Sequence, residues 1–501
     1  MPLLLGDVVR RHARHRPEKI AYVIGPHRVT YRRLNQLANR FAHALRGLGV
    51  GRGDRVATLA RNRLEYPALY FAAAKLGAIH VPVNFRYRAD EIRYTLGQSA
   101  AGALVFADEF RDVVDALRPE LPDLRATLAL DEPDVLASAS DAEPAALVDE
   151  QDPHVMLYTS GTTGDPKGAL LSHRSYVLQA AQTQATIGLG EDDVGLCMFP
   201  MFHMGGWAMP LGYFASGGTV IIMERAEPAE ILRAIPRDGV TYVYLIPTLY
   251  DAVMALPEFA RTDLRSLRAL GAGTSVMTET QIRTIVDRFG IERLFVVYGQ
   301  TEAGPIATLR PPDVLRKPTS VGRPVATVDV RLEAGDGTEV APGGVGEIVA
   351  RSEYGMQGYW RMPEETARVR RDGWIHTGDL GTLDDEGFLH IAGRVKEVVK
   401  SGGENVFPAE VERCLLEHPG IAEAAVFGVP DARWGEAAVA VVVRKAGAAL
   451  DEADVVAHVR GRLAGYKKPQ AVRFAYALPR TASTRQVQKT LLRERWLRGD
   501  A

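Results

Sequence analysis

The chain has 501 residues, which is too long for one ordinary hydrophobic core and predicts two or more domains. Hydrophobic residues make up 46% and charged residues 24%, as in globular proteins, and the formal net charge of -2 argues against nucleic acid or an anionic membrane surface as a partner. No stretch offers about 20 apolar residues, so no integral membrane segment is expected. The two cysteines, Cys197 and Cys414, form no metal or disulfide pattern, which favours a reducing, cytoplasmic location.

The N-terminal residues 1–19 predict a surface helix and not a signal peptide, because a short apolar run is followed by arginines and histidines. Strands and helices then alternate, which predicts parallel sheets covered on both faces. Residues 131–152, rich in Ala, Asp, Glu and Pro, predict a surface connection. The strands are expected at 55–60, 79–83, 103–107, 219–223 and 240–245, and the helices at 65–77, 89–98 and 228–235.

The pattern of hydrophobic residues changes from about Phe388, where short apolar strands become frequent. We expect strands at 424–429 and 437–443 and helices at 408–416 and 454–463. This pattern predicts a smaller α+β domain, with its boundary at 393–396. The fold class is therefore α/β, with a large N-terminal domain (1–393) of layered parallel sheets and helices and a small α+β C-terminal domain (394–501).

The strongest motif is Y-T-S-G-T-T-G-D-P-K-G at 158–168, which follows an apolar run that fits a strand. Glycines let the backbone turn close to a ligand, and hydroxyls, backbone amides and one ammonium together form a cradle for polyphosphate. A flexible Gly/Ser/Thr linker is the alternative. The candidate phosphate-binding residues are Thr159, Ser160, Gly161, Thr162, Thr163, Gly164 and Lys167.

This string resembles the signature of the adenylate-forming (ANL) superfamily, in its acyl-CoA synthetase or AMP-dependent ligase branch. The resemblance covers nearly the whole chain, because further motifs follow in the family's order. They are Y-G-Q-T-E at 298–302, W-I-H-T-G-D-L at 374–380, G-R-V-K-E-V-V-K-S-G-G-E at 393–404, D-A-R-W-G-E at 431–436 and Y-K-K-P at 466–469. The resemblance implies an AMP-binding adenylation domain, a mobile C-terminal domain, and the cofactors ATP, Mg²⁺ and coenzyme A.

The segment 298–302 is expected to meet adenine and magnesium. Tyr298 can stack on adenine, although a lone tyrosine after two valines also fits a core aromatic. Glu302 is a hard carboxylate suited to Mg²⁺, and the resemblance places Thr163 beside the same ion. Thr301 can donate to the α-phosphate. Gly299 and Gln300 are further candidates for the nucleotide site. A second segment, Gly271, Ala272, Gly273 and Thr274, fits a small-residue turn beneath the adenine and the acid, and a plain loop is its alternative.

Asp379 follows Thr-Gly, and its carboxylate can accept from both ribose hydroxyls, although a helix N-cap is the alternative. Arg394 is expected to reach the ribose or phosphate. Lys396 matches the family's hinge position near 394–396, where backbone rotation moves the small domain, and a solvated loop lysine is its alternative. The residues that resemble the loop approaching the pantetheine arm are Lys400, Gly402, Gly403 and Glu404.

An aromatic and Met-rich stretch, P-M-F-H-M-G-G at 200–206, predicts the wall of an apolar acid pocket. In the family a residue here gates the acid's carboxylate and the thiol tunnel, which favours His203 over the ordinary alternative of a core histidine. The other pocket candidates are Met204, Gly205, Trp207 and Tyr244.

The chain departs from the family near its C-terminus, where a Gly-Lys pair normally supplies the lysine of the adenylation step. Here Thr484-Arg485-Gln486 stands in that place, one residue longer. Three interpretations stay open: Arg485 acts as the cation, Lys489 reaches in after a local shift, or adenylation is weakened. We favour Arg485, although a planar guanidinium does not replace an ammonium conservatively.

The predicted function is ATP-dependent adenylation of a small-molecule hydrophobic carboxylic acid, fatty or aryl, with pyrophosphate release, followed by thioester formation with coenzyme A and AMP release. The expected catalytic residues are Lys167, His203, Thr301, Glu302 and Arg485. Two alternatives remain, an enzyme that loads a carrier-protein thiol and a nucleotide-binding protein with weakened catalysis. We expect no carrier domain after Ala501, and the sequence leaves homodimerisation open.

Overall fold

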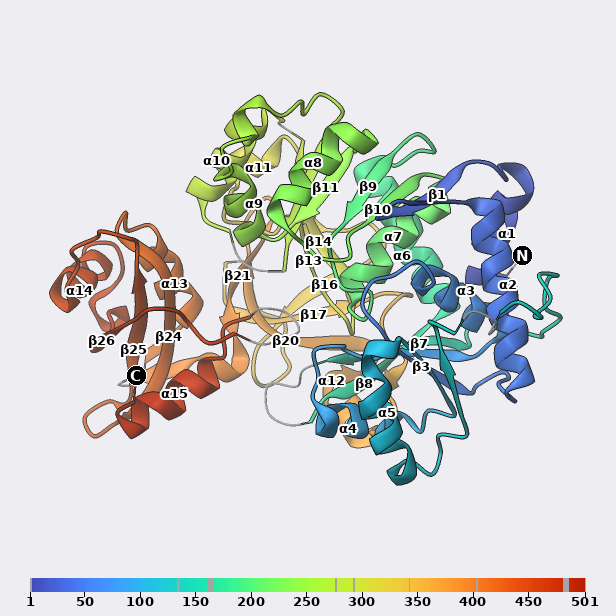
Figure 1. The fold of residues 1–501 in the computed structure, drawn as a ribbon. Coiled ribbons are helices and arrows are strands. Elements are labelled where there is room, and N and C mark those ends of the chain that lie inside the picture. The colour runs from blue at the N-terminus through green and yellow to red at the C-terminus, as the bar shows by residue number, and fades with distance from the viewer. Residues whose placement is uncertain are drawn as a thin grey trace.

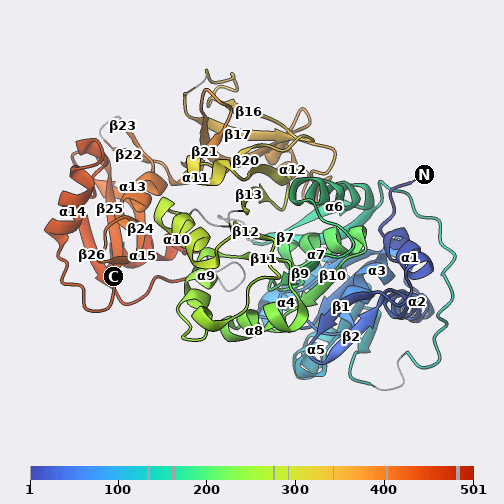
Figure 2. The same ribbon diagram turned by 90° about the horizontal axis from the view of Figure 1, so that it is seen from above.

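The structure is a computed structural model that describes residues 2–132, 136–159, 165–274, 277–291, 293–341, 343–401, 404–480 and 486–500. Figure 1 shows a large body, coloured from blue through yellow to light orange, and a C-terminal lobe in deeper orange and red at one side of it. The view from above keeps the two parts distinct (Figure 2). No helix in these described ranges is long and apolar enough to cross a membrane.

The first sheet of the large body is parallel at its centre, where β3 pairs with β4 and β5. Its strand order is β18-β8-β7-β4-β3-β5-β6, and an antiparallel β7–β8 hairpin lies towards one edge. The strands are β3 (Arg55–Leu59), β4 (Ile79–Pro82), β5 (Ala103–Phe106), β6 (Ala126–Ala129), β7 (Pro153–Thr159), β8 (Lys167–Ser172) and β18 (Gly358–Tyr359).

The second sheet has the order β15-β14-β13-β12-β11-β9-β10-β1-β2 and is parallel from β13 to β1. Antiparallel strands close both of its edges. The strands are β1 (Ile20–Ile24), β2 (His27–Thr30), β9 (Val194–Cys197), β10 (Thr219–Ile222), β11 (Tyr242–Leu245), β12 (Ala269–Gly273), β13 (Leu294–Gln300), β14 (Gly304–Leu309) and β15 (Arg323–Pro324).

Helices cover these sheets, and α3 (Tyr66–Leu76) lies wholly in the core, because its residues are hydrophobic except Lys75, which is buried in an ion pair with Glu143. Local caps set the helix limits: Ser172 accepts a hydrogen bond from the Ser175 backbone at 3.1 Å where α6 begins. The other helices of the large body are α1 (Leu5–His15), α2 (Tyr31–Gly47), α4 (Ala89–Ser99), α5 (Arg111–Leu117), α6 (His173–Ile187), α7 (Met204–Ser216), α8 (Pro228–Asp238), α9 (Pro247–Met254), α10 (Glu279–Phe289), α11 (Asp313–Arg316) and α12 (Pro363–Val369).

Two smaller sheets complete the fold. A mainly antiparallel one stands above the large body in Figure 2, and another forms the C-terminal lobe, where only the β25–β26 pairing is parallel. The former holds β16 (Asp329–Glu333), β17 (Gly346–Arg351), β19 (Arg370–Arg371), β20 (Trp374–Leu383) and β21 (Leu389–Arg394). The lobe holds β22 (Val399–Ser401), β23 (Glu404–Val406), β24 (Ile421–Asp431), β25 (Gly435–Arg444), β26 (Ala471–Ala475), α13 (Pro408–Leu416), α14 (Glu452–Arg460) and α15 (Lys489–Arg498).

The predicted α/β class, with a large body of parallel sheets and a small C-terminal α+β part, is confirmed. Several predicted limits are wrong: α8 and the two long strands of the lobe extend beyond their predicted ranges, and α14 ends at Arg460 and not at residue 463. Two of the wrong limits have clear local reasons. Strand β11 begins at Tyr242 and not at residue 240, because the Val240 amide still donates to Ile235 of α8. Helix α14 begins before Asp454, because Asp451 caps it. The antiparallel sheet of β16, β17, β19, β20 and β21 is an addition that the sequence analysis did not predict.

A sealed polar cluster lies in the core of the large body. His80, His154 and His173 are fully buried, and the ring of Trp207 stacks on Tyr70 with centroids 3.9 Å apart. Neither ring nitrogen of His154 has a hydrogen-bond partner among the described residues. Burial lowers the pKa of His173 to about 4 and of His80 to about 3, so all three imidazoles are neutral near pH 7.

Candidate active site

A cavity of about 2700 Å³ lies between the large body and the C-terminal lobe. Part of its wall is formed by loops that follow the carboxyl ends of β9 to β13, including Met198, Ile246, Thr274 and Thr301. Open parallel sheets bind ligands at this edge, because the loops there converge and the backbone dipoles remain accessible. The opposite wall comes from the C-terminal lobe, through residues such as Lys489.

The described ends of the predicted phosphate-binding string lie at the end of β7 and the start of β8. Thr159 pairs directly with Lys167 across the two strands, and both line the cavity. The candidates Ser160, Gly161, Thr162, Thr163 and Gly164 lie outside the described residues. Lys167 forms an ion pair with Glu365 of α12, and its ammonium lies 5.4 Å from the ring centre of Tyr359. The lysine is thus held at the start of β8, on the wall of the cavity.

Glu302 faces the same cavity just after β13, next to Thr301, Gly299 and Gln300. The Tyr359 hydroxyl donates a 2.7 Å hydrogen bond to its carboxylate. Burial raises the pKa of Tyr359 well above its usual value, so the phenol keeps the proton that it donates. No cation pairs with Glu302 among the described residues. A hard carboxylate without a cationic partner suits Mg²⁺, which takes few protein ligands and keeps several waters.

Asp379 lies on β20 opposite Arg394 of β21, with Asp379 Oδ1 3.2 Å from Arg394 Nε. The Tyr298 hydroxyl donates to Asp379 Oδ2 at 2.8 Å. The phenol therefore belongs to a polar cluster, and its ring still lines the cavity, so Tyr298 is not the core aromatic that the sequence also allowed. Burial raises the pKa of Asp379, and the Arg394 charge opposes that rise. Asp379 is not a helix N-cap, since it lies within a strand.

The acid-pocket candidates divide between the cavity and the core. His203 caps α7, its Nδ1 accepts from the Gly205 amide at 3.2 Å, and burial lowers its pKa to about 4. His203, Met204, Gly205 and Tyr244 line the cavity. The prediction for Trp207 is wrong, because Trp207 is fully buried in the aromatic core and is not among the cavity-lining residues.

The small residues at 271–274 are not a turn. Gly271, Ala272 and Gly273 are the end of strand β12, and only Gly273 and Thr274 line the cavity. A side chain at either glycine would overlap a tyrosine hydroxyl, that of Tyr242 at Gly271 and that of Tyr244 at Gly273. The glycines therefore make room for two tyrosines of the neighbouring strand.

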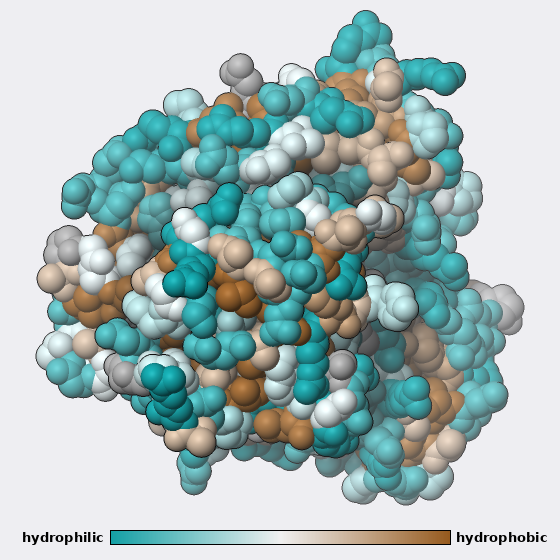
Figure 3. All heavy atoms as spheres, turned by 90° about the vertical axis from the view of Figure 1, so that its left-hand side faces the viewer, coloured by the Kyte–Doolittle hydropathy of each residue, from teal (hydrophilic) through white to brown (hydrophobic). Residues whose placement is uncertain are grey.

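In the C-terminal lobe, Lys396 lies in a short 3-10 turn, Val395–Glu397, that lines the cavity. Lys400 and Glu404 lie on the β22–β23 hairpin and do not reach the cavity, and Gly402 and Gly403 fall outside the described residues. The face of the lobe shown in Figure 3 is largely hydrophilic, with apolar residues in small separate groups.

The candidate cation Arg485 also lies outside the described residues. Lys489, at the start of α15, lines the cavity, but its ammonium lies 2.6 Å from Glu397 and 2.8 Å from Glu412. Sequence analysis missed Tyr359, Glu365 and Tyr242, which reach the site from remote elements. For Tyr242 a signal existed, since it alternates with Tyr244 along one strand face.

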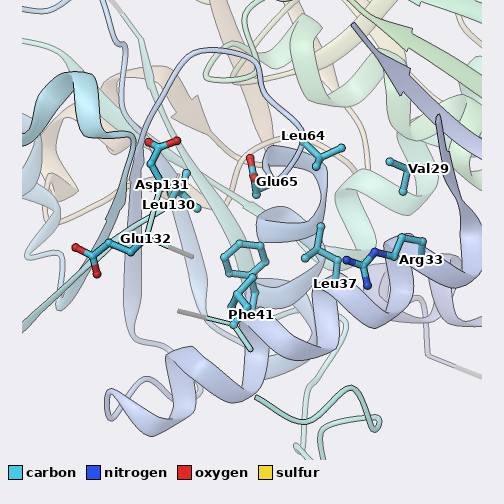
Figure 4. A pocket seen from close by; sticks show the side chains of 10 residues that line it. Val29, Arg33, Leu37, Phe41, Leu64, Glu65, Leu130, Asp131 and Glu132 are labelled. Atoms are coloured by element: carbon cyan, nitrogen blue, oxygen red, sulfur yellow. The ribbon is translucent and has the colours of Figure 1, made fainter. Parts of the chain in front are cut away.

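The structure also has a separate, smaller pocket of about 250 Å³ in the large body (Figure 4). It is framed by apolar side chains of β2, α2 and the segment after β6, with Arg33 at one end and Asp131 and Glu132 at the other. Of the predicted site residues that the structure describes, none lines it. We therefore assign the candidate active site to the larger cavity.

The chain is similar to known proteins over nearly its whole length. Residues 9–360 match the family described as AMP-binding enzyme, and residues 410–485 match the AMP-binding enzyme C-terminal domain. The chain is 40% identical to a feruloyl-CoA synthase from Amycolatopsis sp, covering 96% of each chain. It is 36% identical to a long-chain-fatty-acid–CoA ligase from Mycobacterium tuberculosis, covering 98% of each. The crystal structure of ATP-bound MatB from Rhodopseudomonas palustris superposes with a TM-score of 0.92 at 31% identity, covering 100% of both chains.

Proposed function

The chain belongs to the AMP-binding enzyme family, in its acyl-CoA synthetase branch, and on that premise we propose that it joins a hydrophobic acid, aryl or fatty, to coenzyme A. ATP, Mg²⁺ and coenzyme A are the cosubstrates and metal of such AMP-forming ligases. One observation carries the proposal: Lys167, Glu302 and Asp379 line the same cavity, together with a wall of aromatic side chains. The domains on either side of it would be 1–393 and 394–501.

In the first step the acid's carboxylate attacks the α-phosphate of ATP and pyrophosphate leaves. This step asks the protein for positioning and for stabilisation of negative charge. Lys167 and the β7–β8 turn would bind the phosphates, and Thr301 would donate to the α-phosphate. Asp379 and Arg394 would bind the ribose, beside Tyr298. Mg²⁺, held by Glu302 with Thr163, supplies positive charge to the phosphate oxygens when bound.

The acid would lie along the wall that carries Phe199, His203 and Tyr244. His203 is neutral near pH 7, because burial lowers its pKa, so it would not pair with the carboxylate as a cation. In the second step the thiolate attacks the acyl-adenylate and AMP leaves. We assign to Lys396 the hinge that turns the C-terminal lobe between steps, bringing the hairpin with Lys400, Gly402, Gly403 and Glu404 to the cavity.

The test is acid-dependent exchange of pyrophosphate into ATP over a panel of aryl and fatty acids, followed by addition of coenzyme A and mass detection of the acyl-CoA. Exchange with product formation supports the proposal. Exchange without acyl-CoA, but with loading of a phosphopantetheine carrier protein, would replace coenzyme A by a carrier thiol. Binding of ATP without exchange by any acid would leave a nucleotide-binding protein with weakened catalysis. We place the reaction in the cytoplasm, since both Cys197 and Cys414 are free and buried.

A further inference from the structure

Two tyrosines on one face of β11 lean towards the catalytic end of the cavity. Tyr242 pairs with Ala269, yet its hydroxyl lies over Gly271, two residues farther along β12. Tyr244 pairs with Gly271, and its hydroxyl lies over Gly273 in the same manner. The two hydroxyls thus form a row along the strand, with Tyr244 nearer the nucleotide end and Tyr242 deeper.

The deeper hydroxyl lacks a partner. Tyr242 is 2% exposed, its Oη has no hydrogen bond among the described residues, and it lines the cavity. The neighbouring Tyr213, whose ring covers Gly195 next to Tyr242, also has an unpaired buried hydroxyl. By contrast, the Tyr250 hydroxyl donates to the Gly271 carbonyl at 2.9 Å. A buried hydroxyl without a partner is costly, so an open one at the end of a ligand cavity points to a polar group on the ligand.

The wall between these hydroxyls and the nucleotide end is aromatic. The ring of Phe199 lies near-parallel to His203, at 6.3 Å between centroids and 23°, and 5.7 Å from the ring of Tyr244. All three line the cavity. Aromatic side chains bind a planar ring through stacked and edge contacts, which an alkyl chain does not use.

On the premise of the proposed acid–CoA ligase function, we propose that the acid is a planar aryl acid with a hydroxyl or ether oxygen distal to its carboxylate, bound by Tyr242. The two-residue offset between the tyrosines spans roughly 6.6–6.8 Å along a strand, comparable with a para-substituted ring. A tyrosine hydroxyl donates and accepts, so it serves either group.

The test compares kcat/KM for 4-hydroxycinnamate, 4-methylcinnamate and a saturated fatty acid of similar length. The wild type is expected to favour the hydroxyl compound over its methyl counterpart by about 10-fold to 100-fold, because the apolar analogue leaves Tyr242 unpaired. In Tyr242→Phe we expect the two substrates to differ in kcat/KM by no more than about threefold. The hydroxyl of 4-hydroxycinnamate would have lost its hydrogen-bond partner in this variant. The fatty acid is expected to be the poorest substrate of the wild type.

Tyr176→Phe is the matched control, because Tyr176 on α6 also carries a buried, unpaired hydroxyl but is not among the cavity-lining residues. It is expected to keep the wild-type ratio. A wild-type ratio near one, a fatty acid as the best substrate, or an unchanged ratio in Tyr242→Phe would overturn the inference while leaving the ligase function intact. If no acid supports pyrophosphate exchange, the proposed function itself fails, and the inference with it.

Discussion

The two walls of the active-site cavity hold their charges in different ways. On the large body, Glu302 accepts only the Tyr359 hydroxyl at 2.7 Å and has no cationic partner among the described residues. Asp379 is shared by Tyr298 and Arg394, at 2.8 and 3.2 Å. These carboxylates are positioned by neighbours and keep oxygen lone pairs for a ligand, so this wall is preorganised.

On the C-terminal lobe, the ammonium of Lys489 is already paired with carboxylates. Lys489 lies between Glu397 and Glu412, and although burial lowers the pKa of its ammonium, the two carboxylates outweigh that effect and raise it. Glu397 belongs to the turn that carries the proposed hinge, whereas Glu412 lies on α13. Lys489 thus ties the turn to the lobe, and this favours Arg485 as the cation that serves adenylation.

The largest effect should come from Glu302→Gln, which removes the free charge of the preorganised wall. We expect acid-dependent pyrophosphate exchange to fall about 10²-fold to 10³-fold, as when a preorganised charge-stabilising group is lost. Exchange should be measured over a magnesium titration. Tyr359→Phe is the matched variant, since it removes the hydrogen bond but keeps the carboxylate, and its loss should be smaller. Equal losses would mean that Glu302 acts through its hydrogen bond and not through its charge.

The next effect separates the two cations of the lobe. Arg485→Ala should lower exchange about 100-fold and leave stability unchanged, as expected for a group that stabilises developing charge. Lys489→Met should do the reverse. It should keep exchange per folded enzyme but lower the free energy of unfolding by about 1–3 kcal/mol, because two partly buried carboxylates lose their cation.

Activity and denaturant unfolding should be measured on both variants to check this crossed pattern. If Lys489→Met abolishes exchange while Arg485→Ala does not, Lys489 leaves its carboxylates during the reaction, and the contrast between the walls is wrong. Glu412→Gln serves as the control, because it removes one partner of Lys489 and keeps the ammonium.

Asp379→Asn should have a smaller effect, because an amide still offers one acceptor to the ribose. Loss of charge assistance is expected to raise the KM for ATP about 10-fold, with kcat changed less. Initial rates over an ATP titration check this. A fall in kcat at unchanged KM would place Asp379 in the chemical step and not in nucleotide binding.

The parts of this site that could be predicted from sequence are those with local signatures. The phosphate-binding string, Glu302 and Asp379 each lie in a contiguous motif. The pairing of Thr159 with Lys167 was not predicted, because the sequence analysis expected a strand only before the string. The alternating apolar runs likewise predict the parallel sheets.

The remaining parts depend on tertiary packing. Tyr359 reaches Glu302 from 57 residues away, and Glu365 reaches Lys167 from 198 residues away, so no local pattern marks either pair. Trp207 lies in the first turn of α7, where its ring stacks on Tyr70 in the core, whereas His203 is the N-cap residue before the helix and lines the cavity. The aromatic character of Trp207 predicted burial but not which of two apolar environments it enters.

The smallest effect concerns His203, which is the N-cap of α7 and lines the part of the cavity proposed to bind the acid. The folded-state pKa of His203 is lowered to about 4, below an unfolded value near 6.5, so its contribution to stability is present above pH 6.5 and lost as pH falls towards 4. His203→Asn keeps an N-cap acceptor but cannot titrate. Between pH 6.5 and 4 the free energy of unfolding should fall about 1–3 kcal/mol more in the wild type than in this variant. Denaturant unfolding of both proteins measures the difference, in which the effects of His80, His154 and His173 cancel. If the free energy of unfolding changes with pH in the same way in both proteins, His203 already carries its charge in the folded protein. The wall that binds the acid would then hold a cation, as the C-terminal lobe does.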